Sequence, residues 1–123
     1  VGIVCVDSGF ESGVGGAAGR DLKEIEPLVK VATEEEAMEW VIAFVQLYRE
    51  NAKYLDRPYK WIAKVGLDWV QETMSSADER ARLVAAFELS QTIYQKDPWA
   101  ERAEEEEARK FAPLADLTLE AAE

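Results

Sequence analysis

The chain has 123 residues, 48% of them hydrophobic, and a formal net charge of −11. This length allows a single domain, since domains commonly contain about 100–150 residues. The negative charge argues against binding to nucleic acid or to an anionic membrane surface, because both require a cationic protein surface. The sequence has no histidine and a single cysteine, Cys5. It therefore offers no Ser–His or Cys–His nucleophile pair, no His-based metal site and no intrachain disulfide.

Other absences concern the location of the protein. The sequence shows no signal peptide and no apolar run long enough to span a membrane. Its low cysteine content fits a reducing compartment, so a cytoplasmic protein is expected. The first residue is Val1 rather than Met, which suggests a piece of a longer polypeptide.

The N-terminal third predicts three short strands. Val1–Val6 is apolar and β-branched, which favours a buried strand. Cys5 within it would then be an inert, buried thiol. After a turn, Phe10–Val14 is expected to pair antiparallel with the first strand. Pro27–Val31 predicts a third strand, with Pro27 tolerated at its start or on a sheet edge.

Helices are predicted from Thr33 onward. Thr33 and Glu36 have the spacing of a capping box, in which each side chain binds the other residue's backbone N–H. Ala37–Tyr48 follows and is almost wholly apolar, which predicts a helix covered on several sides. Pro58 suits the first turn of a second helix, and Gly66 suits its end.

The remaining sequence predicts further helices and an acidic tail. Leu67–Val70 starts a short helix, and Ser76 with Glu79 forms a second capping box. The predicted fold is α+β: a small antiparallel sheet of about three short strands near the N-terminus, followed by a helical C-terminal half. Residues 1–99 are expected to form the domain and residues 100–123 its acidic C-terminal tail. The tryptophans lie at helical spacings and are interpreted as packing residues: Trp40, Trp61, Trp69 and Trp99.

The glycine-rich segment from Gly15 to Arg20 has three interpretations. The first is a nucleotide site, because Gly13-x-Gly15-x-x-Ala18 matches a relaxed form of the dinucleotide-binding pattern. That pattern must open a crossover helix, for which the residues before Pro27 leave no room. The second interpretation is a turn between strands. The third is a loop whose small residues let the backbone approach a large ligand, with exposed amides and Arg20 able to attract an anion.

Several longer strings resemble a known family. The chain is similar to the C-terminal part of the large subunit of assimilatory NAD(P)H-dependent nitrite reductases, which belong to the siroheme and 4Fe–4S nitrite and sulfite reductases. The similarity covers nearly the whole chain in order. The strings that carry it are VGIV near the start, VGGAAGR at 14–20, VATEEEAMEW at 31–40, FVQLYRENAKYLDR at 44–57, WIAKVGLDWV at 61–70 and KDPWAER at 96–102.

This resemblance implies a piece of a larger redox enzyme. The parent protein would reduce nitrite to ammonia by six electrons, using siroheme coupled to a 4Fe–4S cluster, with electrons delivered from NAD(P)H through FAD. The cluster cysteines of the family lie in Cys-x5-Cys and Cys-x3-Cys motifs, which would end shortly before Val1. Cys5 matches neither motif. The isolated chain is therefore expected to hold no cofactor and to be inactive. Its expected partners are the upstream part of the same subunit and, as a further candidate, the small subunit.

The resemblance also implies a cofactor-facing loop. In related sulfite reductases this loop lies against the siroheme and its carboxylates. The residues carried over to this sequence are Gly15, Gly16, Ala17, Ala18, Gly19 and Arg20. Related enzymes often have Asn in place of Ala17, so only backbone contact is expected there. They commonly have bulky residues in place of Ser12 and Gly13, a departure that weakens the prediction of the second strand.

Two other functions are also compatible with the sequence. A non-catalytic helical interaction domain could use the acidic tail to bind a basic partner. A dinucleotide-binding module would be stabilised by nucleotide. Neither has a motif as long as the strings above.

Overall fold

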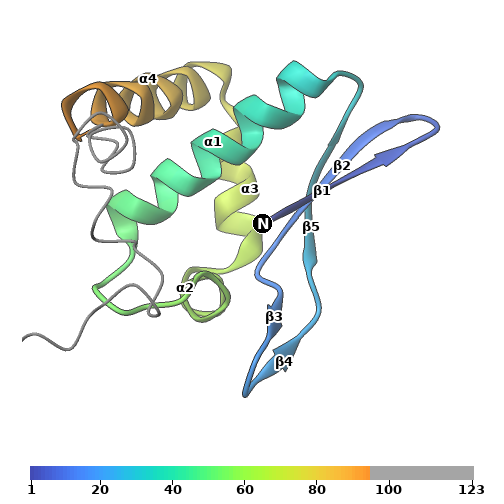
Figure 1. The fold of residues 1–123 in the computed structure, drawn as a ribbon, viewed down its shortest axis with the longest axis vertical. Coiled ribbons are helices and arrows are strands. Elements are labelled where there is room, and N and C mark those ends of the chain that lie inside the picture. The colour runs from blue at the N-terminus through green and yellow to red at the C-terminus, as the bar shows by residue number, and fades with distance from the viewer. Residues whose placement is uncertain (95–123) are drawn as a thin grey trace, which may run out of the picture. The chain divides into compact units, whose positions relative to one another are not determined.

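A computed structural model describes residues 1–94 of the chain. Its elements follow one another in the order β1 (Gly2–Val6), β2 (Gly9–Val14), β3 (Ala17–Ala18), β4 (Leu22–Lys23), β5 (Glu26–Val31), α1 (Glu34–Asn51), α2 (Pro58–Val65), α3 (Leu67–Ser75) and α4 (Ala77–Tyr94) (Figure 1). The predicted α+β class is confirmed. Compact packing divides the chain after Gln91. The boundary expected near residue 99, the acidic tail and the packing role of Trp99 lie outside the described residues.

The main sheet contains the three predicted strands. Its order is β1-β2-β5 and both pairings are antiparallel. Strand β5 is an edge strand, where a proline near the start is tolerated, as predicted for Pro27. The β1–β2 turn needs Gly9, because its φ is 126° and a Cβ there would collide with the Val31 carbonyl oxygen. Strand β2 is present despite Ser12 and Gly13, with a register irregularity between them.

The prediction that the first strand is buried was wrong. Val4 is 60% exposed and the Cys5 thiol is also exposed. The reason lies in the sheet order, because β1 is an edge strand and α1 packs against β2 and β5 instead. An apolar strand sequence shows that burial is favourable, but the neighbouring elements decide whether the strand is covered.

Helix α1 begins with the predicted capping box. The Glu36 N–H donates to Thr33 Oγ1 at 3.2 Å, and the Thr33 N–H donates to the Glu36 carboxylate at 3.3 Å. The helix buries Phe44 and Leu47, and its most exposed large apolar residue is Met38 at 45%. Met38 is the only exposed residue between Ala37 and Tyr48, and α1 contacts β2, β5 and α3, so the prediction of a helix covered on several sides is confirmed. The core around it includes Val14, Leu28, Ala43, Phe44, Leu47, Trp61, Ile62, Val70, Met74 and Leu83.

Trp61 of α2 is the largest buried side chain, with 2% exposed. Its ring makes edge contacts with Phe44, Tyr48 and Trp69, at centroid distances of 6.1, 5.6 and 6.3 Å. The packing role predicted for this tryptophan is confirmed. Trp69 also packs against it but remains 39% exposed.

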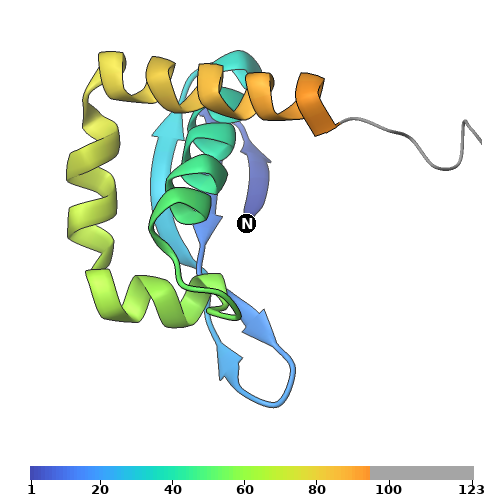
Figure 2. The same cartoon turned by 90° about the vertical axis from the view of Figure 1, so that its left-hand side faces the viewer.

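The three later helices meet at sharp corners, as Figure 2 shows. Pro58 occupies the first turn of α2 as predicted, and Gly66 at φ 86° ends α2 and precedes α3 directly. The side chain of Gln71 in α3 donates to the carbonyl oxygens of Pro27 and Leu28 at 3.0 and 3.1 Å. Helix α3 is therefore tied to strand β5. None of the helices within residues 1–94 is long and apolar enough to cross a membrane.

Candidate functional site

The glycine-rich segment forms a β-hairpin. Ala17 pairs with Lys23 and Ala18 with Leu22, so β3 and β4 make a small antiparallel sheet of their own. The three interpretations of this segment, a nucleotide site, a turn between strands and a ligand-facing loop, did not include strands within it. No helix follows the glycines directly, since α1 starts at Glu34, after β5. Strand β2, the hairpin and β5 therefore do not form the βαβ unit that a dinucleotide-binding fingerprint requires.

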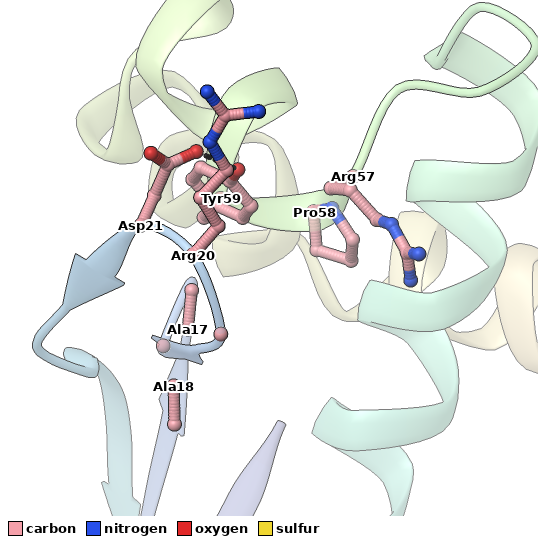
Figure 3. Close-up of a pocket in the computed structure, with 9 residues that line it drawn as sticks. Ala17, Ala18, Arg20, Asp21, Arg57, Pro58 and Tyr59 are labelled. Atoms are coloured by element: carbon pink, nitrogen blue, oxygen red, sulfur yellow. Dashed lines mark hydrogen bonds between the residues drawn. The ribbon is translucent and has the colours of Figure 1, made fainter.

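A groove of about 430 Å³ lies between this hairpin and the start of α2. Figure 3 shows Ala17 and Arg20 on the hairpin side and Arg57 and Pro58 on the helix side. Five of the six predicted site residues line the groove: Gly16, Ala17, Ala18, Gly19 and Arg20. Gly15 precedes these residues in sequence and does not line the groove. The other lining residues are Asp21, Arg57, Pro58 and Tyr59.

A hydrogen bond fixes the hairpin to the opposite wall of the groove. The Tyr59 hydroxyl donates to Asp21 Oδ2 at 3.0 Å, across 38 residues of sequence. At the base of the hairpin, Lys23 forms an ion pair with Glu26 at 2.6 Å. The Tyr59–Asp21 hydrogen bond therefore connects the two walls directly.

The glycines of the segment differ in what the fold demands of them. Gly15 has φ 75°, a conformation that side-chain-bearing residues avoid, and a Cβ there would lie 3.2 Å from Ile62 Cδ1. Gly16 and Gly19 have no positive φ. A Cβ at Gly16 would meet nothing closer than 3.4 Å, and one at Gly19 would meet no atom within 4 Å. The described fold thus requires glycine at 15 but gives no internal reason for it at 16 or 19.

Two arginines that line the groove have no side-chain partner within residues 1–94. Arg49, Arg80 and Arg82 each donate hydrogen bonds to oxygen acceptors. In residues 1–94, neither Arg20 nor Arg57 forms a side-chain hydrogen bond or an ion pair, and both line this groove. Within the same residues, no group of three or more His, Cys, Asp or Glu side chains could hold a metal ion.

The sequence interpretation missed the helix side of the groove. Arg57, Pro58 and Tyr59 lie 37 or more residues beyond Arg20 in the sequence, and no local pattern joins them to it. A weak signal was available at Arg57, because a helix that begins with Pro58 lacks a Ser, Thr, Asp or Asn cap before it. The structure is what brings the two segments together.

Comparison with known proteins identifies the family. Residues 1–81 match the nitrite and sulphite reductase 4Fe-4S domain, and the chain belongs to this family. It is 36% identical over 110 residues to the nitrite reductase [NAD(P)H] of Bacillus subtilis (strain 168). The aligned region covers 89% of this chain and 14% of that protein. It is 24% identical over 95 residues to the assimilatory nitrate reductase electron transfer subunit of the same organism, covering 77% and 12%. No solved structure matches. The chain thus spans a small part of the length of these relatives.

Proposed function

We propose that this chain is the C-terminal segment of a siroheme and 4Fe–4S nitrite reductase large subunit. The match to the family and the 36% identity to a nitrite reductase [NAD(P)H] support this proposal. The parent protein would act in the cytoplasm, reduce nitrite to ammonia, and take electrons from NAD(P)H through FAD. This chain would contact the upstream part of the same subunit and, at a further surface, a small subunit.

Within that enzyme, residues Gly15–Arg20 are proposed to lie against the siroheme. The observation that carries this proposal is the groove wall formed by Gly16, Ala17, Ala18 and Gly19. Glycine at 16 and 19 is not required by the described packing or backbone. Absence of a side chain there is explained if a large external body approaches the backbone closely. A flat tetrapyrrole fits such a wall.

The siroheme, when bound, would supply the iron at which nitrite is reduced. The role of this chain would be to position the cofactor. Backbone groups of residues 16–19 would contact its face or edge, and Arg20 would donate to a carboxylate. The hydrogen bond from Tyr59 of α2 to Asp21 would hold the hairpin in place.

The test is Gly19→Val in the full-length protein that carries this chain. The new side chain has free space in the described structure, so the melting temperature of the cofactor-free protein should stay unchanged. Siroheme content, measured by visible absorption per polypeptide, should fall several-fold. Leu22→Val is the matched control, because Leu22 lies on the same hairpin, is 85% exposed and does not line the groove. Full siroheme content in Gly19→Val would contradict the proposed contact. A full-length protein without siroheme bands would instead favour a non-catalytic interaction domain.

A further inference from the structure

We propose that Arg20 and Arg57 bind carboxylate groups of the ligand in the groove, one from each wall. This inference rests on the proposed function and adds to it a residue, Arg57, on the helix side. In Figure 3 the two arginines belong to different segments, Arg20 to the hairpin and Arg57 to the residue before α2. A ligand between them would be held at two separate points.

The first support is the charge balance of the molecule. The chain has 25 Asp and Glu residues and 14 Lys and Arg residues, so carboxylates are abundant. The other arginines in residues 1–94 all form hydrogen bonds to oxygen acceptors. For Arg80 and Arg82 these acceptors include carboxylates. Against this background, two arginines without partners in a single groove indicate that their anionic partner is not part of residues 1–94.

The second support is the electrostatics of helix α2. Arg57 occupies the position just before its first residue, no side chain caps this end, and the first turn contains no acidic residue. The N-terminus of a helix carries about half a positive charge, so a cation there is unfavourable and an anion favourable. Arg57 therefore adds positive charge to an end that is already positive. An anion in the groove would offset both the charge of Arg57 and the positive end of helix α2.

The third support is the size of the groove, which is much larger than a small inorganic anion needs. A water molecule takes about 30 Å³ in the liquid, and the groove is about 430 Å³. Pockets for organic ligands have volumes of roughly 300–1,000 Å³. The groove therefore has room for an organic molecule, and arginines on both walls suit one with at least two carboxylates. Guanidinium groups bind carboxylates with two parallel hydrogen bonds. Within residues 1–94, Asp21 accepts from Tyr59 and forms no ion pair with Arg20 or Arg57.

The experiment uses Arg57→Gln in the full-length holoenzyme. Since Arg57 makes no side-chain bond in the described structure, the melting temperature of the cofactor-free protein should not change. Siroheme should dissociate about tenfold faster or more, because a hydrogen bond between charged groups is lost. Dissociation is followed by the decay of the visible absorption bands when apomyoglobin is present as an acceptor of released tetrapyrrole. Arg57→Lys should give an intermediate rate, and Arg20→Gln a rate as fast as Arg57→Gln.

Arg49→Gln is the matched control, because Arg49 donates to Ser90 Oγ at 2.9 Å and does not line the groove. Its siroheme dissociation rate should equal that of the unmodified protein. Wild-type dissociation from Arg57→Gln would overturn the role of Arg57 while leaving the proposed function intact, provided that Gly19→Val loses siroheme. Normal siroheme content in Gly19→Val would count against the proposed function itself. A raised KM for nitrite with normal siroheme retention in Arg57→Gln would assign the arginine to the substrate anion and also overturn the inference.

Discussion

Phe44 and Trp61 show at the scale of single residues how the groove is supported. Phe44 is 1% exposed and Trp61 is 2% exposed, and their rings meet edge to face at a centroid distance of 6.1 Å. Trp61 belongs to α2, whose first residues form one wall of the groove. Packing of these two rings therefore fixes the position of that wall relative to α1.

Phe44→Ala should lower the free energy of unfolding of the 123-residue chain by about 3–5 kcal/mol, because it removes a buried ring and leaves a cavity. Chemical denaturation followed by circular dichroism measures this change. Met38→Ala in the same helix is the control and should have a much smaller effect, since Met38 is 45% exposed. An unchanged denaturation midpoint for Phe44→Ala would show that the core described around α1 is wrong.

Residues whose role is set by their sequence neighbours were predicted well. Thr33 and Glu36 form their capping box, and Pro58 begins its helix, because caps and proline act over three or four positions. Cys5 was predicted to be buried and is exposed, because its environment depends on the order of strands. Arg57 was missed for the same reason, since only tertiary packing places it opposite Arg20.

At the scale of elements, α1 carries its own start signal. Its first turn contains Glu34, Glu35 and Glu36, which face the positive end of the helix dipole. The capping box satisfies two backbone N–H groups there. These interactions stabilise the start of α1 directly after strand β5, and α1 then covers the sheet.

Thr33→Ala should destabilise the chain by about 1 kcal/mol, because the Glu36 N–H loses its side-chain acceptor. Thr33→Ser should restore most of this loss, since serine caps equally well. Thermal or denaturant unfolding of the three proteins compares them directly. Equal stability of the alanine and threonine forms would mean that the cap contributes nothing to folding.

The short elements were the hardest to predict. Helix α1 was expected because it combines a cap with a long apolar run, whereas β3 and β4 contain two residues each. Two-residue strands carry no periodicity, and alanines at 17 and 18 do not favour a strand. The candidate site was therefore predicted as a set of residues without its geometry. Hairpin pairing and the helix side of the groove emerged only with the fold.

At the scale of the whole described structure, an ion-pair network connects α1 and α4. Arg82 lies 2.9 Å from Glu50 and 2.7 Å from Glu79. Hydrogen bonding to Arg82 is the main cause that lowers the pKa of Glu50 below its ordinary value of 4.5, and it lowers the pKa of Glu79 as well. Because these carboxylates have lower pKa values when folded, their ionised forms stabilise the fold.

The pH dependence follows from that direction. The stabilisation is fully present above about pH 4.5 and is lost as the pH falls through the lower folded pKa values. Arg82→Gln should therefore flatten the decline of the unfolding free energy below about pH 4.5, and Arg82→Lys should keep part of it. The effect will be small, since the three side chains are partly exposed. Denaturation midpoints at a series of pH values measure this effect. If Arg82→Gln and the unmodified chain have identical pH profiles, the network does not contribute to the stability of the fold.

The open edge of β1 has a consequence for the behaviour of the chain in solution. Val4 and Ile3 are 60% and 40% exposed on an edge strand, and such a strand can pair with the same strand of another copy. The charge of −11 opposes this association by repulsion, and added salt weakens the repulsion. The separated chain should therefore be most soluble at low ionic strength and should self-associate as salt and protein concentration rise.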